Sequence, residues 1–177
     1  MSFTIEALAA TPGIVVRPKT PVKVTKDLDA RARGLALDAA HAQGIDTTAL
    51  RPSAFHFTAI NTGATKSPTL VASFLDPEPS ERNGATAHVL ILADDAGNGY
   101  RPTFRHTASG LVGTAEFRRY IDHLDINGDG IDEIVLEGWQ FAGETFISVL
   151  GYANGEWSEV FRGRSSWCLS KTKHAAE

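Results

Sequence analysis

The sequence predicts a mainly β chain in which two four-stranded antiparallel units follow one helix. Three observations predict this fold class. After Pro52 the 177-residue chain turns to short runs rich in β-branched and aromatic residues, which Gly, Asn, Asp and Pro separate. Asn98-Gly99 and Asn154-Gly155 are strong hairpin signals between such runs. Before Pro52, one stretch carries apolar residues at helical spacing.

The chain is predicted to hold a single β-rich domain over residues 25–177, after an extended N-terminal lead-in over residues 1–24. Three prolines within residues 11–24 favour extended backbone there. The first basic residue is Arg17, so this end lacks the layout of a secretory signal. We therefore expect either a protein that stays in the cytoplasm or the sequence of a trimmed, mature form.

The helix is predicted over residues 26–43. Thr25 is its expected N-cap, since a threonine hydroxyl accepts a hydrogen bond from the first turn, and Gly44 is its expected C-terminal stop. We expect Gly34 to interrupt or weaken the helix. The recurring leucines and alanines that predict its apolar face are Leu28, Ala32, Leu35, Ala39 and Ala40.

Eight strands are predicted after the helix, in an antiparallel meander. They are residues 54–60, 69–75, 87–93, 100–106, 117–124, 133–139, 145–152 and 156–161. The first four form one predicted repeat, residues 54–107, and the last four form a second, residues 117–163.

An internal duplication is indicated by two alignments that need no gap. Residues 60–71 align with residues 124–135 at an offset of 64, and residues 90–105 align with residues 147–162 at an offset of 57. Identical residues are few, and two antiparallel meanders also align by chance because both alternate apolar and polar residues. Duplication and chance similarity therefore both stay open at this point.

Composition excludes several classes of protein. The net charge of −4 argues against nucleic acid as a partner, and no apolar run approaches the ~20 residues of a membrane-spanning helix. The single cysteine, Cys168, excludes an intrachain disulfide. The acidity is local: residues 116–159 hold ten acidic and two basic residues, a net charge of −8, and a basic tail follows. Such a run is either a solvated face or a cation site.

The acidic run contains one segment with the spacing of a calcium loop, Asp125-Ile-Asn-Gly-Asp-Gly-Ile-Asp-Glu133. Its oxygen-bearing side chains fall at loop positions 1, 3, 5 and 9, and calcium takes six to eight hard oxygen ligands. Gly130 permits the sharp turn. The predicted Ca²⁺ ligands are the side chains of Asp125, Asn127, Asp129 and Glu133 and the backbone carbonyl of Ile131. A polar turn between two strands is the alternative.

The loop is not an EF-hand. Position 12 of an EF-hand loop is a bidentate glutamate, but Leu136 stands there in this chain. A β-branched, strand-like run follows the loop, whereas an EF-hand continues into a helix.

This stretch resembles the FG-GAP (VCBS-like) repeat of integrin α-subunit propellers and many bacterial surface proteins. The resemblance covers about residues 117–163 and is degenerate over about residues 54–107. It implies a propeller blade whose calcium loop links the first two strands, with Asp125, Asn127, Asp129, Ile131 and Glu133 as ligands. Aspartate is more usual in the family at the position of Glu133. The resemblance also favours an extracytoplasmic location.

The function that follows from the resemblance is a non-catalytic, calcium-stabilised interaction module with an unidentified protein or carbohydrate ligand. Two blades are too few to close a propeller. They are expected to pack as a sandwich, to pair with another copy through open sheet edges, or to join a larger assembly. The first repeat has Asn61, Gly63, Thr65, Lys66 and Thr69 at the ligand and glycine positions, so we expect no cation there.

Two competing functions stay open. One is a hydrolase or enzyme-accessory domain that uses loop carboxylates, for which Asp94-Asp95 offers further acidic groups. The other is a cytoplasmic interaction protein with an empty calcium site. His88 and His106 are expected to meet on neighbouring strands, as ordinary strand histidines rather than as a metal site.

Overall fold

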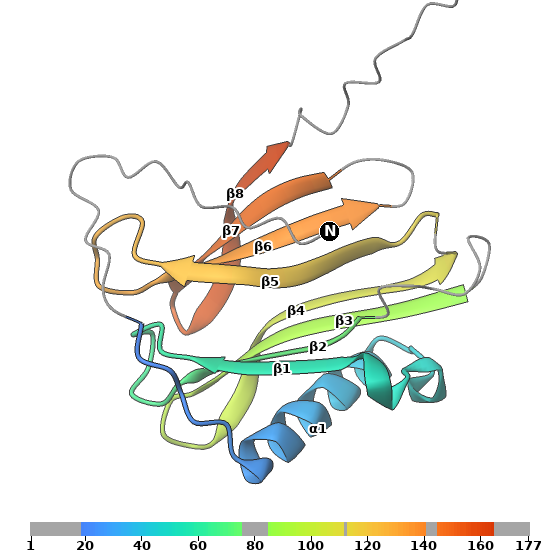
Figure 1. Cartoon of the computed structure of the whole chain (residues 1–177), viewed down its shortest axis with the longest axis horizontal. Helices are drawn as coiled ribbons and strands as arrows, with labels where there is room; N and C mark the ends of the chain where they lie inside the picture. Colours follow the sequence, from blue (N-terminus) through green and yellow to red (C-terminus); the bar gives the residue numbers. More distant parts are fainter. Residues whose placement is uncertain (1–18, 76–84, 112, 141–144, 165–177) are drawn as a thin grey trace, which may run out of the picture.

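The fold was analysed in a computed structural model, which describes residues 19–75, 85–111, 113–140 and 145–164. Most of the predicted lead-in, Trp167, Cys168 and the basic tail lie outside these residues. Within them, the chain forms one α-helix and two four-stranded antiparallel sheets (Figure 1). The predicted fold class is therefore confirmed, and the two sheets do not close into a barrel or a propeller.

Helix α1 (Lys26–Ala42) begins as predicted. The Thr25 hydroxyl oxygen accepts a hydrogen bond from the backbone N–H of Leu28, and Gly44 follows the helix with a positive φ of 71°. The expected interruption at Gly34 is wrong, because the helix runs through it without a break. A glycine there costs only about 1 kcal/mol, and the buried alanine face of α1 offsets that cost by packing against a sheet.

All eight predicted strands are present, although their ends differ from the prediction. The largest difference is in the fourth strand, which continues five residues beyond His106, to Leu111. Ala54 lies in a short 3₁₀ turn rather than in the first strand. The strands are β1 (Phe55–Ile60), β2 (Thr69–Phe74), β3 (Ala85–Asp95), β4 (Tyr100–Leu111), β5 (Glu116–Leu124), β6 (Glu133–Gln140), β7 (Thr145–Ala153) and β8 (Glu156–Arg164).

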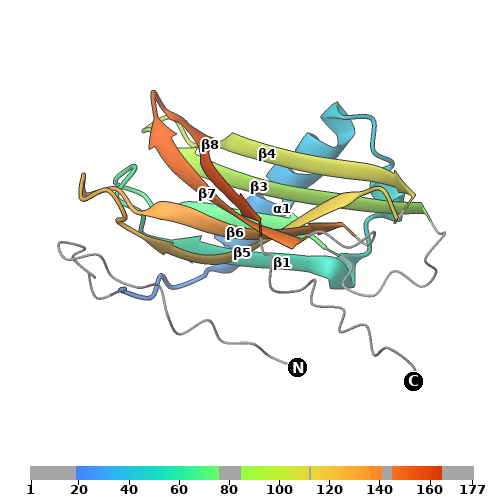
Figure 2. The same cartoon turned by 90° about the horizontal axis from the view of Figure 1, so that it is seen from above.

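The strands form two sheets whose spatial order follows the sequence: β1-β2-β3-β4, here the N-terminal sheet, and β5-β6-β7-β8, the C-terminal sheet. The helix α1 covers one face of the N-terminal sheet, and the C-terminal sheet packs on the other face (Figures 1 and 2). The three layers bury two large apolar cores, one on each side of the N-terminal sheet, and a smaller cluster of Leu75, Ala115 and Phe117. One face of the C-terminal sheet is left without a covering element among the described residues.

The two sheets carry the same irregularity at equivalent positions. In the N-terminal sheet the pairing of β3 with β4 shifts between Leu92 and Ala93, which leaves Thr103 as the extra residue. In the C-terminal sheet the pairing of β7 with β8 shifts between Val149 and Leu150, which leaves Val160 as the extra residue. These positions differ by the sequence offset of 57. Because β-bulges are specific features, their coincidence supports a structural repeat.

A buried carboxylate joins the two sheets. Asp94 on β3 accepts hydrogen bonds from the hydroxyls of Thr69 (2.6 Å) and Thr103 (2.5 Å). Its Oδ2 atom also accepts one from the indole N–H of Trp157 on β8, at 2.8 Å. The side chain of Trp157 is 4% exposed. One acidic group in the core, on β3, therefore accepts from donors on two other strands of its own sheet and on one strand of the other sheet.

A buried histidine forms the second link between the sheets. The Nδ1 atom of His88 lies 2.9 Å from the carbonyl oxygen of Phe74, and its Nε2 atom lies 3.1 Å from the backbone nitrogen of Arg118 on β5. A carbonyl only accepts and an amide only donates, so the proton sits on Nδ1 and the ring is neutral. Burial, with the nearby His106 and Arg118, lowers the pKa of His88 to about 4.

None of the described helices is long and apolar enough to cross a membrane.

Candidate calcium loop

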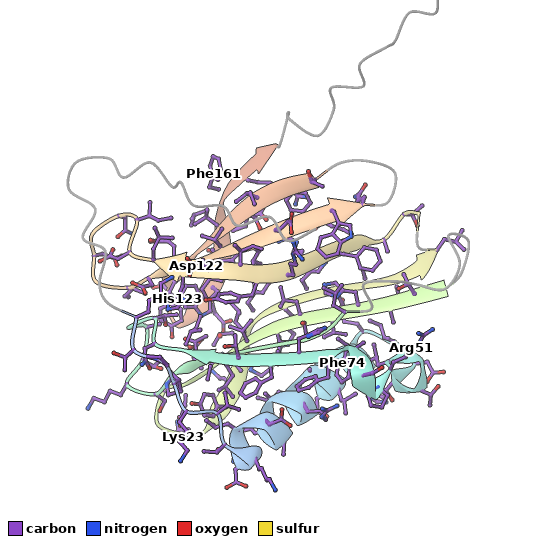
Figure 3. All side chains as sticks on the ribbon, in the orientation of Figure 1. Lys23, Arg51, Phe74, Asp122, His123 and Phe161 are labelled. Atoms are coloured by element: carbon purple, nitrogen blue, oxygen red, sulfur yellow. The ribbon has the colours of Figure 1, made fainter. Side chains whose placement is uncertain are left out.

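The predicted calcium loop, residues 125–133, joins β5 to β6 at one end of the C-terminal sheet. Figure 3 shows this end of the sheet, marked by the labelled Asp122 and His123 at the tip of β5. Gly128 and Gly130 adopt the left-handed backbone region, with φ of 81° and 92°. A residue with a Cβ atom is strained there, so the turn assigned to Gly130 does require glycine.

The polar side chains of the loop fold inward onto the loop's own backbone. The two carboxylate oxygens of Asp125 accept hydrogen bonds from the backbone N–H groups of Gly128 (2.7 Å) and Gly130 (3.0 Å). Asn127 Oδ1 accepts from the N–H of Asp129, and Asp129 Oδ1 accepts from the N–H of Ile131, both at 2.8 Å. These nested turns hold successive oxygens on the inner side of the loop.

The fourth predicted ligand, Glu133, closes the cluster from the start of β6. Its Oε2 atom accepts from the N–H of Ile126 at 2.7 Å, and its Oε1 atom accepts from the Asn127 amide nitrogen at 2.7 Å. The same amide nitrogen donates to Asp129 Oδ2 at 3.0 Å. The structure therefore brings the four predicted side-chain ligands together, while the backbone carbonyl of Ile131 as a fifth ligand stays a prediction.

The cluster is acidic and partly buried. Asp125 is 5% exposed and Glu133 is 6% exposed, whereas Asp129 is exposed. Burial is the main cause that raises the pKa of Glu133, and the charges of Asp129 and Asp125 raise it further. A cation among these oxygens would offset both effects. In this structure the amide nitrogen of Asn127 lies between two carboxylates and donates a hydrogen bond to each of them.

The donor set fits calcium better than a transition metal. The four side chains offer oxygen ligands, which calcium prefers, and the loop holds neither histidine nor cysteine. Within the described residues, no three His, Cys, Asp or Glu side chains lie together closely enough to hold a metal ion, and this includes Asp125, Asp129 and Glu133, so calcium binding would require these carboxylates to move closer together. The rings of His88 and His106 do meet, with centroids 5.5 Å apart, but His88 is engaged in the two backbone contacts given above.

The corresponding loop of the first repeat lies against the calcium loop. The carbonyl oxygen of Thr62 accepts a hydrogen bond from the N–H of Asp132 at 2.7 Å. Gly63, with φ of 83°, faces the backbone of Gly130. The side chains of the first-repeat loop include no carboxylate. Thr69, which aligns with Glu133, is buried and hydrogen-bonded to Asp94.

We predict that Gly63→Ala lowers the free energy of unfolding by about 1–3 kcal/mol. Left-handed backbone costs an alanine about 1–2 kcal/mol, and the new Cβ atom would lie 2.7 Å from the carbonyl oxygen of Gly130. Gly44→Ala is the matched control, since Gly44 has a similar φ of 71° and no atom within 4 Å of the Cβ position. Urea unfolding of both variants tests this prediction, which fails if Gly63→Ala costs no more than Gly44→Ala.

The acidic pair proposed for an enzyme has structural roles. Asp94 is buried and accepts the three hydrogen bonds described above. Asp95 accepts hydrogen bonds from the backbone N–H groups of Gly97 and Gly99, at 2.7 and 2.9 Å, and so closes the turn between β3 and β4. Both carboxylates are therefore engaged in hydrogen bonds within the fold.

A polar network next to the calcium loop was not predicted. The Tyr120 hydroxyl lies 2.6 Å from His123 Nδ1, and His123 Nε2 lies 3.7 Å from a carboxylate oxygen of Asp132. Burial raises the pKa of Tyr120, so its phenol stays protonated. A cavity of about 220 Å³ lies here between the two repeat loops. These residues are adjacent only in space, and their sequence spacing carries no signal.

A larger cavity of about 560 Å³ was also not predicted. It lies between the calcium loop and the outer face of β7 and β8, and its lining includes Asn127, Asp129 and Glu133. The opposite side is apolar and includes Val149, Val160 and Phe161. Val160 is 63% exposed and Phe161 is 57% exposed. Figure 3 shows Phe161 on the side of the C-terminal sheet away from α1.

Comparison of the chain with protein-family models, curated proteins and solved structures finds no match. The likeness to FG-GAP repeats stays a prediction from the sequence.

Proposed function

We propose that the chain is a non-catalytic interaction module in which Ca²⁺ stabilises the loop of residues 125–133. The observation that carries this proposal is the convergence of Asp125, Asn127, Asp129 and Glu133, with two of the carboxylates buried. Asn127 would turn its amide oxygen toward the ion. Bound Ca²⁺ would supply positive charge among these oxygens and hold together the loop that joins β5 to β6.

The engagement of Asp94 and Asp95 supports an interaction module over the enzyme alternative. A general acid or base needs a carboxyl group that reaches a substrate in a pocket. The cavity beside the calcium loop is lined mainly by apolar groups, which favours binding over acid–base chemistry.

We predict that adding calcium to chelator-treated protein raises its melting temperature. At a calcium concentration 100 times the dissociation constant, the stabilisation is about 2.7 kcal/mol, equivalent to about 5–10 °C for a chain of this size. Asp129→Ala is expected to abolish the shift. Its side chain is exposed, so the variant should fold. Scanning calorimetry at several calcium concentrations measures the effect.

The matched control is Thr65→Ala, because Thr65 aligns with Asp129 in the first repeat and its loop carries no carboxylate. This variant is expected to keep the full calcium shift. The proposal is wrong if the wild-type protein shows no shift, or if Asp129→Ala shows the same shift as the wild type.

A further inference from the structure

The open face of the C-terminal sheet is the counterpart of a face that is packed in the N-terminal sheet. Leu70 faces α1 in the N-terminal sheet, and its aligned residue Ile134 faces the N-terminal sheet. Val71 faces the C-terminal sheet, and its aligned residue Val135 points the other way, because neighbours on a strand alternate. The two sheets are thus stacked in the same orientation. The face of the C-terminal sheet that corresponds to the packed face of the N-terminal sheet is therefore its outer face.

The cavity beside the calcium loop lies on this outer face. Val149 and Phe161 line it, and they align with Leu92 and Phe104, which pack in the core between the sheets. Val160 also lines it and aligns with Thr103, the bulge residue that bonds Asp94. The surface is therefore built like an internal packing face, although it is exposed.

The N-terminal sheet shows what such a face receives. The C-terminal sheet covers it with Ile134, Leu136, Leu150 and Trp157, and Trp157 belongs to the same core cluster as Leu92. The indole N–H of Trp157 donates to the carboxylate of Asp94 at 2.8 Å. A tryptophan thus supplies both apolar area and a hydrogen bond to the buried carboxylate of this face.

The C-terminal sheet also has a carboxylate near the place that corresponds to Asp94, but this carboxylate lies on the neighbouring strand. In the N-terminal sheet Asp94 lies beside Thr69, to which it is hydrogen-bonded. The aligned residues in the C-terminal sheet are Gly151 and Glu133, and both line the cavity. The side chain of Val160 lies against Gly151, with its Cγ1 atom 3.0 Å from the position of a Cβ atom there, so the apolar wall continues across the place of Asp94. Glu133, on the neighbouring strand β6, supplies the acceptor.

We propose that this cavity binds a tryptophan side chain of a partner polypeptide, with its indole N–H directed at Glu133. The cavity volume of about 560 Å³ suits an aromatic side chain and its flanking residues. The local charge complements the ligand, since residues 116–159 carry a net charge of −8 and an N–H group is a donor. Basic residues flanking the tryptophan would match Asp129 at the mouth.

The proposed partner is a different chain, because neither tryptophan among the described residues is available to a second copy. Of the tryptophans in the described residues, Trp157 is buried between the sheets and Trp139 is stacked on Phe117, with ring centroids 5.7 Å apart. Neither is free to enter the cavity of another copy. The proposal deepens the interaction function proposed above and rests on it, but the groove does not require calcium.

The test uses the full chain with labelled methyl groups and N-acetyl-tryptophanamide as the probe, followed by NMR in calcium and in chelator. We expect saturable shifts of the Val149 and Val160 methyl signals at millimolar probe. The 1-methyl-indole analogue lacks the N–H donor, and we expect it to bind about tenfold more weakly, because a hydrogen bond to a charged group is lost. Equal binding of the two probes would overturn the contact with Glu133.

Two variants locate the site. Phe161→Asp places a charge on the apolar wall and is expected to remove the shifts, whereas Ile121→Asp is expected to leave them unchanged. Ile121 is also an exposed apolar residue, but it lies on β5 and does not line the cavity. Probe binding that survives Phe161→Asp in a folded protein would overturn the proposal.

Sedimentation of the free protein gives the remaining decisive outcome. We expect a monomer, and self-association that Phe161→Asp abolishes would overturn the proposal by showing that a second copy covers the face. The result is separable from the calcium proposal. A missing calcium shift with intact, N–H-dependent probe binding contradicts only the calcium loop, whereas an intact calcium shift without probe binding contradicts only the groove.

Discussion

Replacing Asp94 with alanine is expected to lower the free energy of unfolding by about 3–5 kcal/mol, because a buried donor that loses its acceptor costs about 1–3 kcal/mol and this carboxylate serves three of them. The donors of Thr69, Thr103 and Trp157 would all lose their acceptor in the core. A buried donor without an acceptor destabilises the folded state by its desolvation free energy, which no hydrogen bond then offsets. Urea unfolding at neutral pH measures the change.

The matched control is Asp94→Asn, which keeps the shape of the side chain. Its amide oxygen is able to accept from Trp157 and Thr103, and its amide nitrogen is able to donate to the hydroxyl oxygen of Thr69. The Thr69 hydroxyl then turns its own hydrogen toward Thr62, 2.9 Å away. We expect this variant to cost far less than alanine. Equal costs for the two variants would contradict the role given to the hydrogen bonds.

Lowering the pH from 7 to 4 is expected to remove up to about 3 kcal/mol of stability through His88 alone. The pKa of this ring is about 4 in the folded protein and about 6.5 in the unfolded chain. Between these values the unfolded chain binds the proton and the folded protein does not, so stability rises with pH in this window. The contribution is complete above pH 6.5 and is lost as the pH falls toward 4.

The main structural cause of the lowered pKa is burial of the ring. Protonation would also break the contact between Nε2 of His88 and the backbone N–H of Arg118, because a protonated ring has no acceptor left for that donor. His88→Gln is the informative variant, since glutamine offers a donor and an acceptor but does not titrate. Burial also lowers the pKa values of His106 and His123, so the wild type is compared with this variant at each pH. A difference that does not change between pH 7 and pH 4.5 would contradict the assignment.

Much of the fold was predictable because its signals are local. Alternating β-branched residues and the dipeptides Asn98-Gly99 and Asn154-Gly155 placed all eight strands. The strand ends were less predictable: β4 continues to Leu111 because β3 extends beside it from Ala85 and supplies partners. Gly34 was misjudged because the penalty for a helical glycine is intrinsic, whereas the packing of the alanine face is tertiary.

The candidate site was predictable in part for the same reason. A calcium loop takes its side-chain ligands from alternate positions of one short segment. The local spacing therefore suffices to predict the candidate ligands Asp125, Asn127, Asp129 and Glu133. The cavity beside them is built from β7 and β8 as well as from the loop, and no local pattern relates these segments.

The sequence by itself determined that the chain forms two similar four-stranded meanders and that one loop carries oxygen-bearing side chains at alternate positions. Only the tertiary structure decided which face of each sheet is covered. Every strand has two faces of alternating side chains, and the order in which layers stack selects the buried one. Stacking in the same orientation pairs Trp157 with Asp94 and leaves Phe161 in the open. These contacts join residues distant in sequence, and their energies depend on burial that no single segment creates alone.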